Sequence, residues 1–101
     1  MNRLDLKDVV ALITDLPGWR YEQIRGGVLE RELVFTDFIQ AFGFITQLAL
    51  LAEKRDHHPE WSNVYNQVKI TLTTHDASGV SMRDVEMARS VERLYKVLIS
   101  L

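Results

Sequence analysis

The segment from residue 36 to residue 55 limits the fold of this 101-residue chain more than any other part. Its apolar residues recur at steps of three and four, which predicts a helix that ends at about Arg55, with Thr36 as its N-cap and Asp37 in its first turn. They form two stripes: Phe38, Phe42, Ile45, Ala49 and Ala52, and Ile39, Phe44, Leu48 and Leu51. A helix with so wide an apolar surface is expected to pack on a sheet and also on a second surface. We therefore expect a homo-oligomer, dimer or tetramer, formed through Phe38–Ala52 and a sheet edge.

Two hairpins flank this helix, one on each side along the chain. They consist of Trp19–Ile24, the turn Arg25-Gly26-Gly27 and Val28–Phe35, and of Trp61–Tyr65, the turn Asn66-Gln67 and Val68–Thr73. Val68–Thr73 is the clearest strand because apolar and polar residues alternate along its whole length. In Val28–Phe35, Arg31 interrupts the side that carries Leu29, Leu33 and Phe35. The inner face of that strand is therefore less well defined.

Two more helices are predicted near the ends of the chain. Asp5–Leu16 has apolar residues at helical spacing and is followed by Pro17-Gly18, which stops a helix. Ser81-Met82-Arg83-Asp84 resembles a capping box and opens a last helix that runs to about Ser100. The resulting order is α-β-β-α-β-β-α. It predicts one α+β domain over residues 1–101, with a four-stranded antiparallel sheet and three helices on one face.

Composition excludes several classes of protein. The chain has no cysteine, which rules out disulfides and thiolate chemistry and fits a reducing compartment. No apolar run reaches the roughly 18 residues of a membrane span, and the N-terminus carries no apolar signal region. The net charge is −2, with no Lys/Arg cluster longer than a pair, so direct nucleic-acid binding is not expected. We expect a cytoplasmic protein with no membrane association.

All three histidines lie within one short window. His57 and His58 follow the predicted helix, and His75 comes 18 residues after His57, behind a strand. An antiparallel hairpin can bring both segments to one rim of the sheet. Histidine titrates at a pKa of about 6.5, so a pair on opposite sides of a substrate can act as acid and base. Nearby carboxylates, including Glu53 and Asp84, are candidates for orienting the rings.

Metal binding and ordinary loop histidines are the alternatives. Adjacent histidines in an extended segment point in opposite directions, and no His-x-His or His-x-x-x-His pair exists. No metal is therefore expected. The residues alone leave acid/base chemistry and incidental loop histidines both open, and they leave Trp61 and Tyr65 as possible strand core residues.

Several motifs together resemble one known family. They are Ala41-Phe42-Gly43-Phe44, Ala52-Glu53-Lys54, Asp56-His57-His58-Pro59-Glu60-Trp61, Asn63-Val64-Tyr65-Asn66, Thr74-His75-Asp76 and Gly79-Val80-Ser81, followed by Asp84. The chain resembles the pterin-4a-carbinolamine dehydratases, most densely between about residues 35 and 92. The resemblance implies a dehydratase that converts 4a-hydroxytetrahydropterin to quinonoid dihydropterin. This step recycles the tetrahydrobiopterin-type cofactor of aromatic amino-acid hydroxylases, and the resemblance implies no cofactor or metal for the dehydratase itself.

The resemblance also implies roles for individual residues. His57 and His75 become the acid/base pair, His58 polarises the hydroxyl region of the substrate, and Glu53 and Asp84 orient the histidines, although Asp84 could serve only as a helix cap. The expected pterin site consists of His57, His58, Pro59, Thr74, His75, Asp76 and Ala77, with Trp61 or Trp19 as an aromatic wall. Some animal members of the family are dimerisation cofactors of a homeodomain transcription factor. A non-catalytic interaction module, either of that kind or as an accessory to a pterin or molybdopterin enzyme, is therefore the alternative function.

Overall fold

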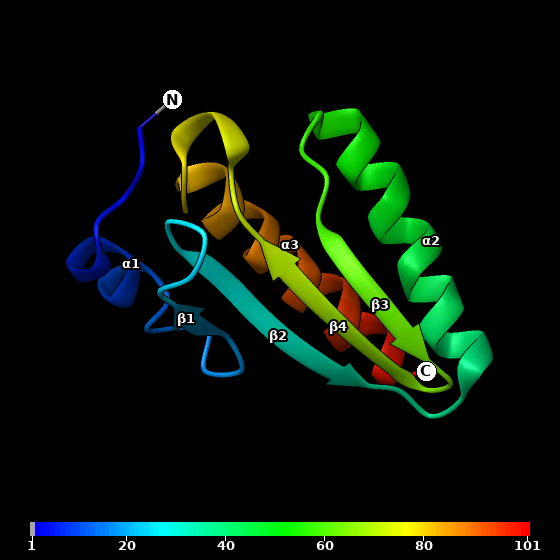
Figure 1. Ribbon diagram of the computed structural model, residues 1–101. Coiled ribbons are helices and arrows are strands. Elements are labelled where there is room, and N and C mark those ends of the chain that lie inside the picture. The colour runs from blue at the N-terminus through cyan, green and yellow to red at the C-terminus, as the bar shows by residue number, and fades with distance from the viewer. Residues whose placement is uncertain (1) are drawn as a thin grey trace.

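Four antiparallel strands and three helices make up the computed structural model, which describes residues 2–101. The elements are α1 (Leu6–Leu12), β1 (Arg20–Glu22), β2 (Val28–Val34), α2 (Phe38–Arg55), β3 (Glu60–Val64), β4 (Gln67–Leu72), the short 3-10 helix η1 (His75–Ala77) and α3 (Met82–Ile99). The predicted order α-β-β-α-β-β-α is confirmed, with η1 added inside the loop before α3. The strands form one open sheet in the order β1-β2-β4-β3, so β1 and β3 are its two edges (Figure 1).

The inner face of the sheet is set by the alternation of β4. Val68, Ile70 and Leu72 are buried, as the pattern predicts. In β2, Leu29 and Leu33 are buried on the same face. Arg31 interrupts that face because its guanidinium pairs with Glu92 of α3, with 3.1 Å between Nε and Oε2. The break in the sequence pattern therefore marks an ion pair between the sheet and α3.

The helices gather on one face of the sheet, which confirms the predicted α+β class (Figure 1). From α2 the core takes Ala41, Phe44, Leu48 and Ala52, and from α3 it takes Val85, Met87, Ala88 and Val91. The small helix α1 lies against α3, where the Arg89 guanidinium donates to the carbonyl of Leu12. The two predicted stripes of α2 do not divide into an inner and an outer face. Phe44 and Leu48 of the second stripe are buried whereas Ile39 of the same stripe is 81% exposed, and Phe38 and Phe42 of the first stripe are also exposed.

Several predicted boundaries differ from the structure, and β1, for example, is Arg20–Glu22 instead of Trp19–Ile24. Three of the differences have a local cause. The N-cap of α2 is Asp37, whose carboxylate accepts from the Gln40 N–H, and Thr36 lies one residue before it. Helix α1 ends at Leu12 instead of Leu16, because the Thr14 hydroxyl bonds to helix carbonyls and a turn follows. The β3–β4 turn is Tyr65-Asn66, since Val64 pairs with Gln67 in the ladder. Each of these boundary shifts results from a local side-chain hydrogen bond or from the pairing register of the strands. None of them changes the hydrophobic pattern.

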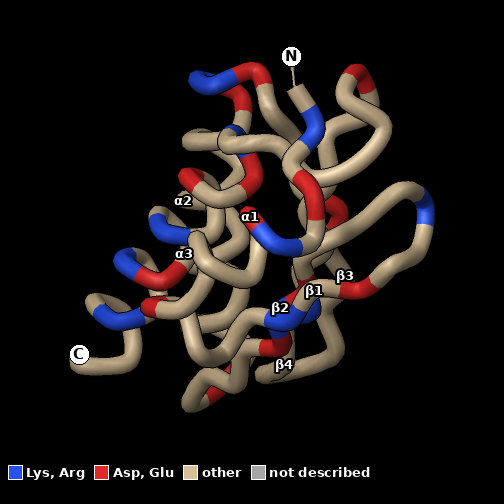
Figure 2. The backbone as a smooth tube through the Cα atoms, turned by 90° about the vertical axis from the view of Figure 1, so that its left-hand side faces the viewer, with Lys and Arg blue, Asp and Glu red and all other residues tan. Residues whose placement is uncertain are grey.

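Charged residues of both signs are mixed along the surface. Figure 2 shows Lys/Arg and Asp/Glu side by side on α3, which carries Arg89, Glu92, Arg93 and Lys96. Such interspersed charges do not form the continuous basic face that nucleic acid requires. Within residues 2–101, none of the helices combines the length and apolarity needed to cross a bilayer.

Candidate active site

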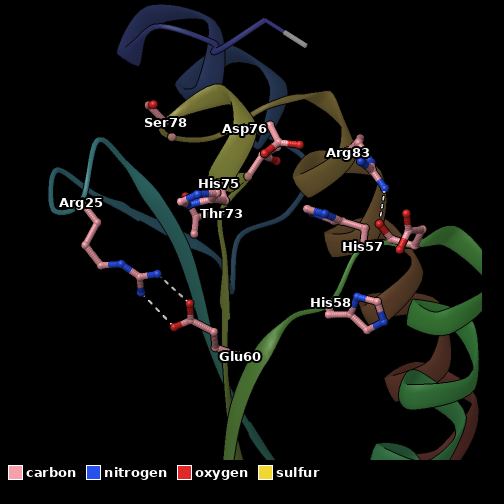
Figure 3. Close-up of a pocket in the computed structure, with 12 residues that line it drawn as sticks. Arg25, His57, His58, Glu60, Thr73, His75, Asp76, Ser78 and Arg83 are labelled. Carbon is pink, nitrogen blue, oxygen red and sulfur yellow. Dashed lines mark hydrogen bonds and ion pairs between the residues drawn. The ribbon is translucent and has the colours of Figure 1, made fainter.

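A cavity of about 640 Å³ lies at the end of the sheet where the β1–β2 turn, the α2–β3 loop and the β4–α3 loop meet (Figure 3). It is lined by Arg25, Asp56, His57, His58, Glu60, Thr73, Thr74, His75, Asp76, Ser78, Gly79 and Arg83. All three histidines are among these residues, so the hairpin brings the two histidine segments to one rim. The polar lining and the size suit a small heterocycle with several hydrogen-bonding groups.

The C-terminus of α2 fixes the position of His57. Asp56 has the left-handed backbone conformation (φ 51°), and its N–H bonds to the carbonyls of Ala52 and Glu53. The His57 N–H then bonds to the Ala52 carbonyl at 3.1 Å, which is a Schellman-type ending. Arg83 of α3 donates to the carbonyl of Asp56 and so ties the helix end to α3. The backbone hydrogen bonds at the end of α2 therefore fix the position of His57 independently of the contacts of its ring.

The ring of His57 is bonded to a buried carboxylate. Its Nε2 lies 2.6 Å from Oδ1 of Asp84, a residue with no exposed surface. The other oxygen of Asp84 accepts from the Thr74 hydroxyl at 2.7 Å and from the Ser81 N–H at 2.9 Å. Asp84 therefore caps α3 and also orients His57.

The direction of each hydrogen bond in this cluster follows from what the groups can donate. An ionised carboxylate only accepts, so the Thr74 hydroxyl gives its single proton to Asp84. The Ser81 hydroxyl, 2.7 Å from Thr74 Oγ1, must then donate to Thr74. By the same rule neutral His57 carries its proton on Nε2, which leaves Nδ1 as the nitrogen with a lone pair. Ser81 and Thr74 thus follow one another behind Asp84, and the carboxylate of Asp84 is the group that selects the tautomer of His57.

His58 and His75 are held less tightly than His57. His58 Nε2 lies 2.9 Å from Glu53 Oε1, but the two side chains are 57% and 82% exposed, so water competes with this pair. His75 is exposed at the start of η1, and no hydrogen bond to its ring is present among the described residues. Its ring is therefore available to a ligand. Across residues 2–101, no three His, Cys, Asp or Glu side chains gather into a group that could hold a metal ion.

An ion pair that the sequence did not predict lies at one end of the cavity. The Arg25 guanidinium donates to both oxygens of Glu60, at 2.8 and 2.6 Å (Figure 3). Arg25 lies in the β1–β2 turn, which packs closely on the β4–α3 loop: a side chain on Gly26 would overlap the Ser78 carbonyl. The hydrogen bonds from Arg25 lower the pKa of Glu60 below its ordinary value of 4.5. Arg25 lies in the predicted turn and Glu60 in a motif of the family resemblance, but nothing in the sequence indicates that the two residues pair.

Some expected site residues lie elsewhere. Trp19 is buried in the core, and its indole Nε1 donates to Glu92 at 3.1 Å. Trp61 lies on β3 opposite Ile70, and neither tryptophan lines the cavity. The expected aromatic wall is therefore not formed by either residue in this structure. Pro59 and Ala77 also lie outside the lining, whereas Thr74 lines the cavity with its hydroxyl turned toward Asp84.

Comparison with known proteins points to one family. The model of the family described as "Pterin 4 alpha carbinolamine dehydratase" matches residues 2–94. A relative from Rhodopseudomonas palustris (strain BisB18), provisionally named a pterin-4-alpha-carbinolamine dehydratase, is 48% identical over 93% of this chain and 92% of its own length. A "transcriptional coactivator/pterin dehydratase" from Brucella melitensis superimposes with a TM-score of 0.88 at 44% identity, over 93% of this chain and 99% of its own.

A more distant solved structure shares the fold alone. It is described as a pterin dehydratase-like protein that is a RuBisCO assembly factor in the alpha-carboxysome. Its identity is 24% and its TM-score 0.67, over 77% of this chain and 89% of its own. The same architecture therefore occurs in proteins described by different functions.

Proposed function

Because this chain belongs to the pterin 4 alpha carbinolamine dehydratase family, we propose that its cavity removes water from a 4a-hydroxytetrahydropterin. The product is the quinonoid dihydropterin, and the step recycles the tetrahydrobiopterin-type cofactor used by aromatic amino-acid hydroxylases. The observation that carries the proposal is the convergence of His57, His58 and His75 on one polar cavity, with His57 bonded to a buried carboxylate.

The proposed reaction needs one acid and one base. The bond between C4a and the hydroxyl oxygen breaks, and that oxygen takes a proton and leaves as water. N5 loses its proton, and the electron pair of the N–H bond forms the N5=C4a double bond. Atoms and charge balance without a change of oxidation state. His57 and His75, which reach the cavity from the α2–β3 and β4–α3 loops, are suited to these two proton transfers.

The three histidines have different surroundings, which suggests different roles. His57 exchanges its proton at Nδ1, because Nε2 is committed to Asp84. The ring of His75 has no competing hydrogen bond among the described residues, and it takes the opposite proton. His58 binds the hydroxyl region of the substrate, and Glu53 steadies its ring only weakly because both side chains are exposed. A dehydration assay with carbinolamine made in situ tests the whole assignment.

Thr74 provides a test of how Asp84 is positioned. We expect Thr74→Val, which keeps the shape and removes the donor to Asp84, to lower kcat about tenfold and to leave KM within about twofold. Thr74→Ser keeps the hydroxyl and should restore most of the loss. Steady-state kinetics at several pH values measures both parameters. A rise in KM at constant kcat would instead show that Thr74 only contacts the substrate.

The exposed apolar side of α2 supports a second part of the proposal, self-association. Phe38, Ile39, Phe42 and Leu50 are 46%, 81%, 55% and 69% exposed. Side chains of this size rarely cluster in solvent on a monomeric protein. We propose that α2, together with the free edge of the sheet at β3, forms the contact between copies of this chain.

We expect Phe42→Glu to weaken this self-association at least about tenfold, because it places a charge in an apolar contact. Sedimentation velocity between about 1 and 100 μM measures the effect, and Gln47→Glu on the same helix is the matched control. A wild-type protein that sediments as a monomer over this range would refute the oligomer. The same surface would serve an interaction module, and the Brucella melitensis protein is described both as a coactivator and as a pterin dehydratase. An oligomer that does not accelerate dehydration would favour that second candidate.

A further inference from the structure

The ion pair between Arg25 and Glu60 joins opposite edges of the sheet. Arg25 follows β1 and Glu60 begins β3, and the strand order β1-β2-β4-β3 puts two strands between them. Both side chains line the histidine cavity. In Figure 3 the pair lies on the far side of the drawn residues from His57 and His58, with His75 between them. The pair therefore marks a second end of the cavity, separate from the proposed proton-transfer end.

The geometry of the Arg25–Glu60 pair resembles the contact of a carboxylate with an amidine-like group, which presents two parallel N–H donors. Two nitrogens of Arg25 donate in parallel, one to each oxygen of Glu60, at 2.8 and 2.6 Å. The pyrimidine ring of a pterin carries the same arrangement, because its N3–H and its 2-amino group are two parallel donors on one N–C–N unit. The two oxygens of one carboxylate can accept hydrogen bonds from only one such pair of donors at a time. Arg25 thus occupies the position that the edge of a bound pterin would need.

We propose that Glu60 is a specificity-determining residue that binds the N3–H and 2-amino edge of the pterin, and that Arg25 holds this position in the free protein and is displaced by the substrate. The proposal rests on the proposed function, in that it takes a pterin as the ligand of the cavity. It assigns the pyrimidine half of the ligand to the Glu60 end and leaves C4a and N5 to the histidines.

Three properties of the pair support an exchangeable contact. The side chains of Arg25 and Glu60 are 54% and 55% exposed, so their attraction is weakened by water and its replacement has a small cost. Arg25 also has a positive φ of 53°, which is unfavourable for a residue with a side chain, so its position in the free protein carries some backbone strain. The ordinary pKa of a glutamate, 4.5, already lies well below neutral pH, and Arg25 lowers the pKa of Glu60 further in the free protein, so Glu60 is an ionised carboxylate that can accept two hydrogen bonds. Asp56 and Asp76 also line the cavity but hold no such two-donor partner among the described residues.

A matched pair of ligands tests the proposal directly. 6-Methylpterin has the 2-amino group, and 6-methyllumazine has an oxygen in its place, so it would point an acceptor at the carboxylate. We expect the wild-type protein to bind the pterin at least about tenfold more tightly than the lumazine, by titration calorimetry. In Glu60→Gln this ratio should fall to about threefold or less. Glu32→Gln, an exposed carboxylate of β2 outside the cavity lining, is the control and should keep the wild-type ratio.

Arg25→Ala distinguishes displacement of Arg25 by the ligand from a role in which Arg25 only supports the position of Glu60. Loss of the competing guanidinium should tighten pterin binding about two- to fivefold and leave lumazine binding unchanged. Retention of the wild-type ratio in Glu60→Gln, or a loss of pterin affinity in Arg25→Ala equal to that in Glu60→Gln, would overturn the proposal, as would failure of the wild-type protein to bind either ligand. Pterin selectivity without dehydration would support the role of Glu60 while refuting the proposed enzyme. Dehydration without pterin selectivity at Glu60 would support the proposed enzyme while refuting the role of Glu60.

Discussion

His75→Ala is expected to lower the turnover of 4a-carbinolamine dehydration at least about tenfold, and His57→Ala should have an equal or larger effect. A well-placed acid or base typically contributes about 10²–10⁴-fold. His75 gives the cleaner result, because its exposed ring has no hydrogen bond among the described residues and its removal should change stability by less than about 0.5 kcal/mol. Stopped-flow absorbance measures turnover after the spontaneous rate is subtracted.

The two variants differ in what they leave behind. His57→Ala leaves Oδ1 of Asp84 buried without its partner, so a loss of about 1–3 kcal/mol in the free energy of unfolding should accompany the loss of activity. His75→Gln keeps a polar side chain that cannot transfer a proton near neutral pH, and it should be as slow as His75→Ala. Wild-type turnover in either His75 variant would remove that residue from the mechanism.

Asp84→Asn should lower both turnover and stability. The amide can still accept from the Thr74 hydroxyl and the Ser81 N–H with its oxygen, which places its NH₂ group toward His57. Nε2 of His57 must then accept, so the ring proton moves to Nδ1 and the proposed reactive nitrogen loses its lone pair. We expect turnover to fall about 10²-fold and the free energy of unfolding to fall by about 1–3 kcal/mol. Urea unfolding and the dehydration assay measure the two effects.

A cap variant separates the two roles of Asp84. Ser81→Ala removes a hydroxyl that accepts from the Arg83 N–H at 3.3 Å, and it leaves the contact between Asp84 and His57 in place. We expect it to destabilise α3 by about 1 kcal/mol with only a small effect on turnover. If Asp84→Asn shows the same pattern as Ser81→Ala, Asp84 is a cap and does not control the tautomer of His57.

Much of the fold can be predicted from the sequence because its periodic signals are strong. The alternation in Val68–Thr73 and the helical spacing in Phe38–Arg55 each allow one interpretation, and the structure confirms both elements to within a residue. The break at Arg31 was visible in the sequence, but its cause was not. Its partner Glu92 lies 61 residues further along the chain, and no local pattern indicates such a pair.

The site was predictable where the chemistry was concentrated in one short segment. His57, His58 and His75 stand out by composition alone, and hairpin geometry brings them together. Arg25 and Glu60 do not stand out, because their pairing depends on the strand order β1-β2-β4-β3, which hydrophobic pattern does not determine. Trp19 is a residue that was expected at the site but lies in the core. A tryptophan beside a turn suits a core and a ligand wall equally well, and only the packed structure shows its bond to Glu92.

The most direct test of the proposed function is the rate at which the wild-type protein dehydrates a 4a-hydroxytetrahydropterin. The carbinolamine is generated in situ by a pterin-dependent hydroxylase, and formation of the quinonoid dihydropterin is followed by stopped-flow absorbance with increasing amounts of this protein. We predict a rate that rises above the spontaneous one in proportion to protein concentration, and that returns to the spontaneous rate when His57 and His75 are both replaced by alanine. A wild-type rate equal to the spontaneous rate at every protein concentration would contradict the proposed function.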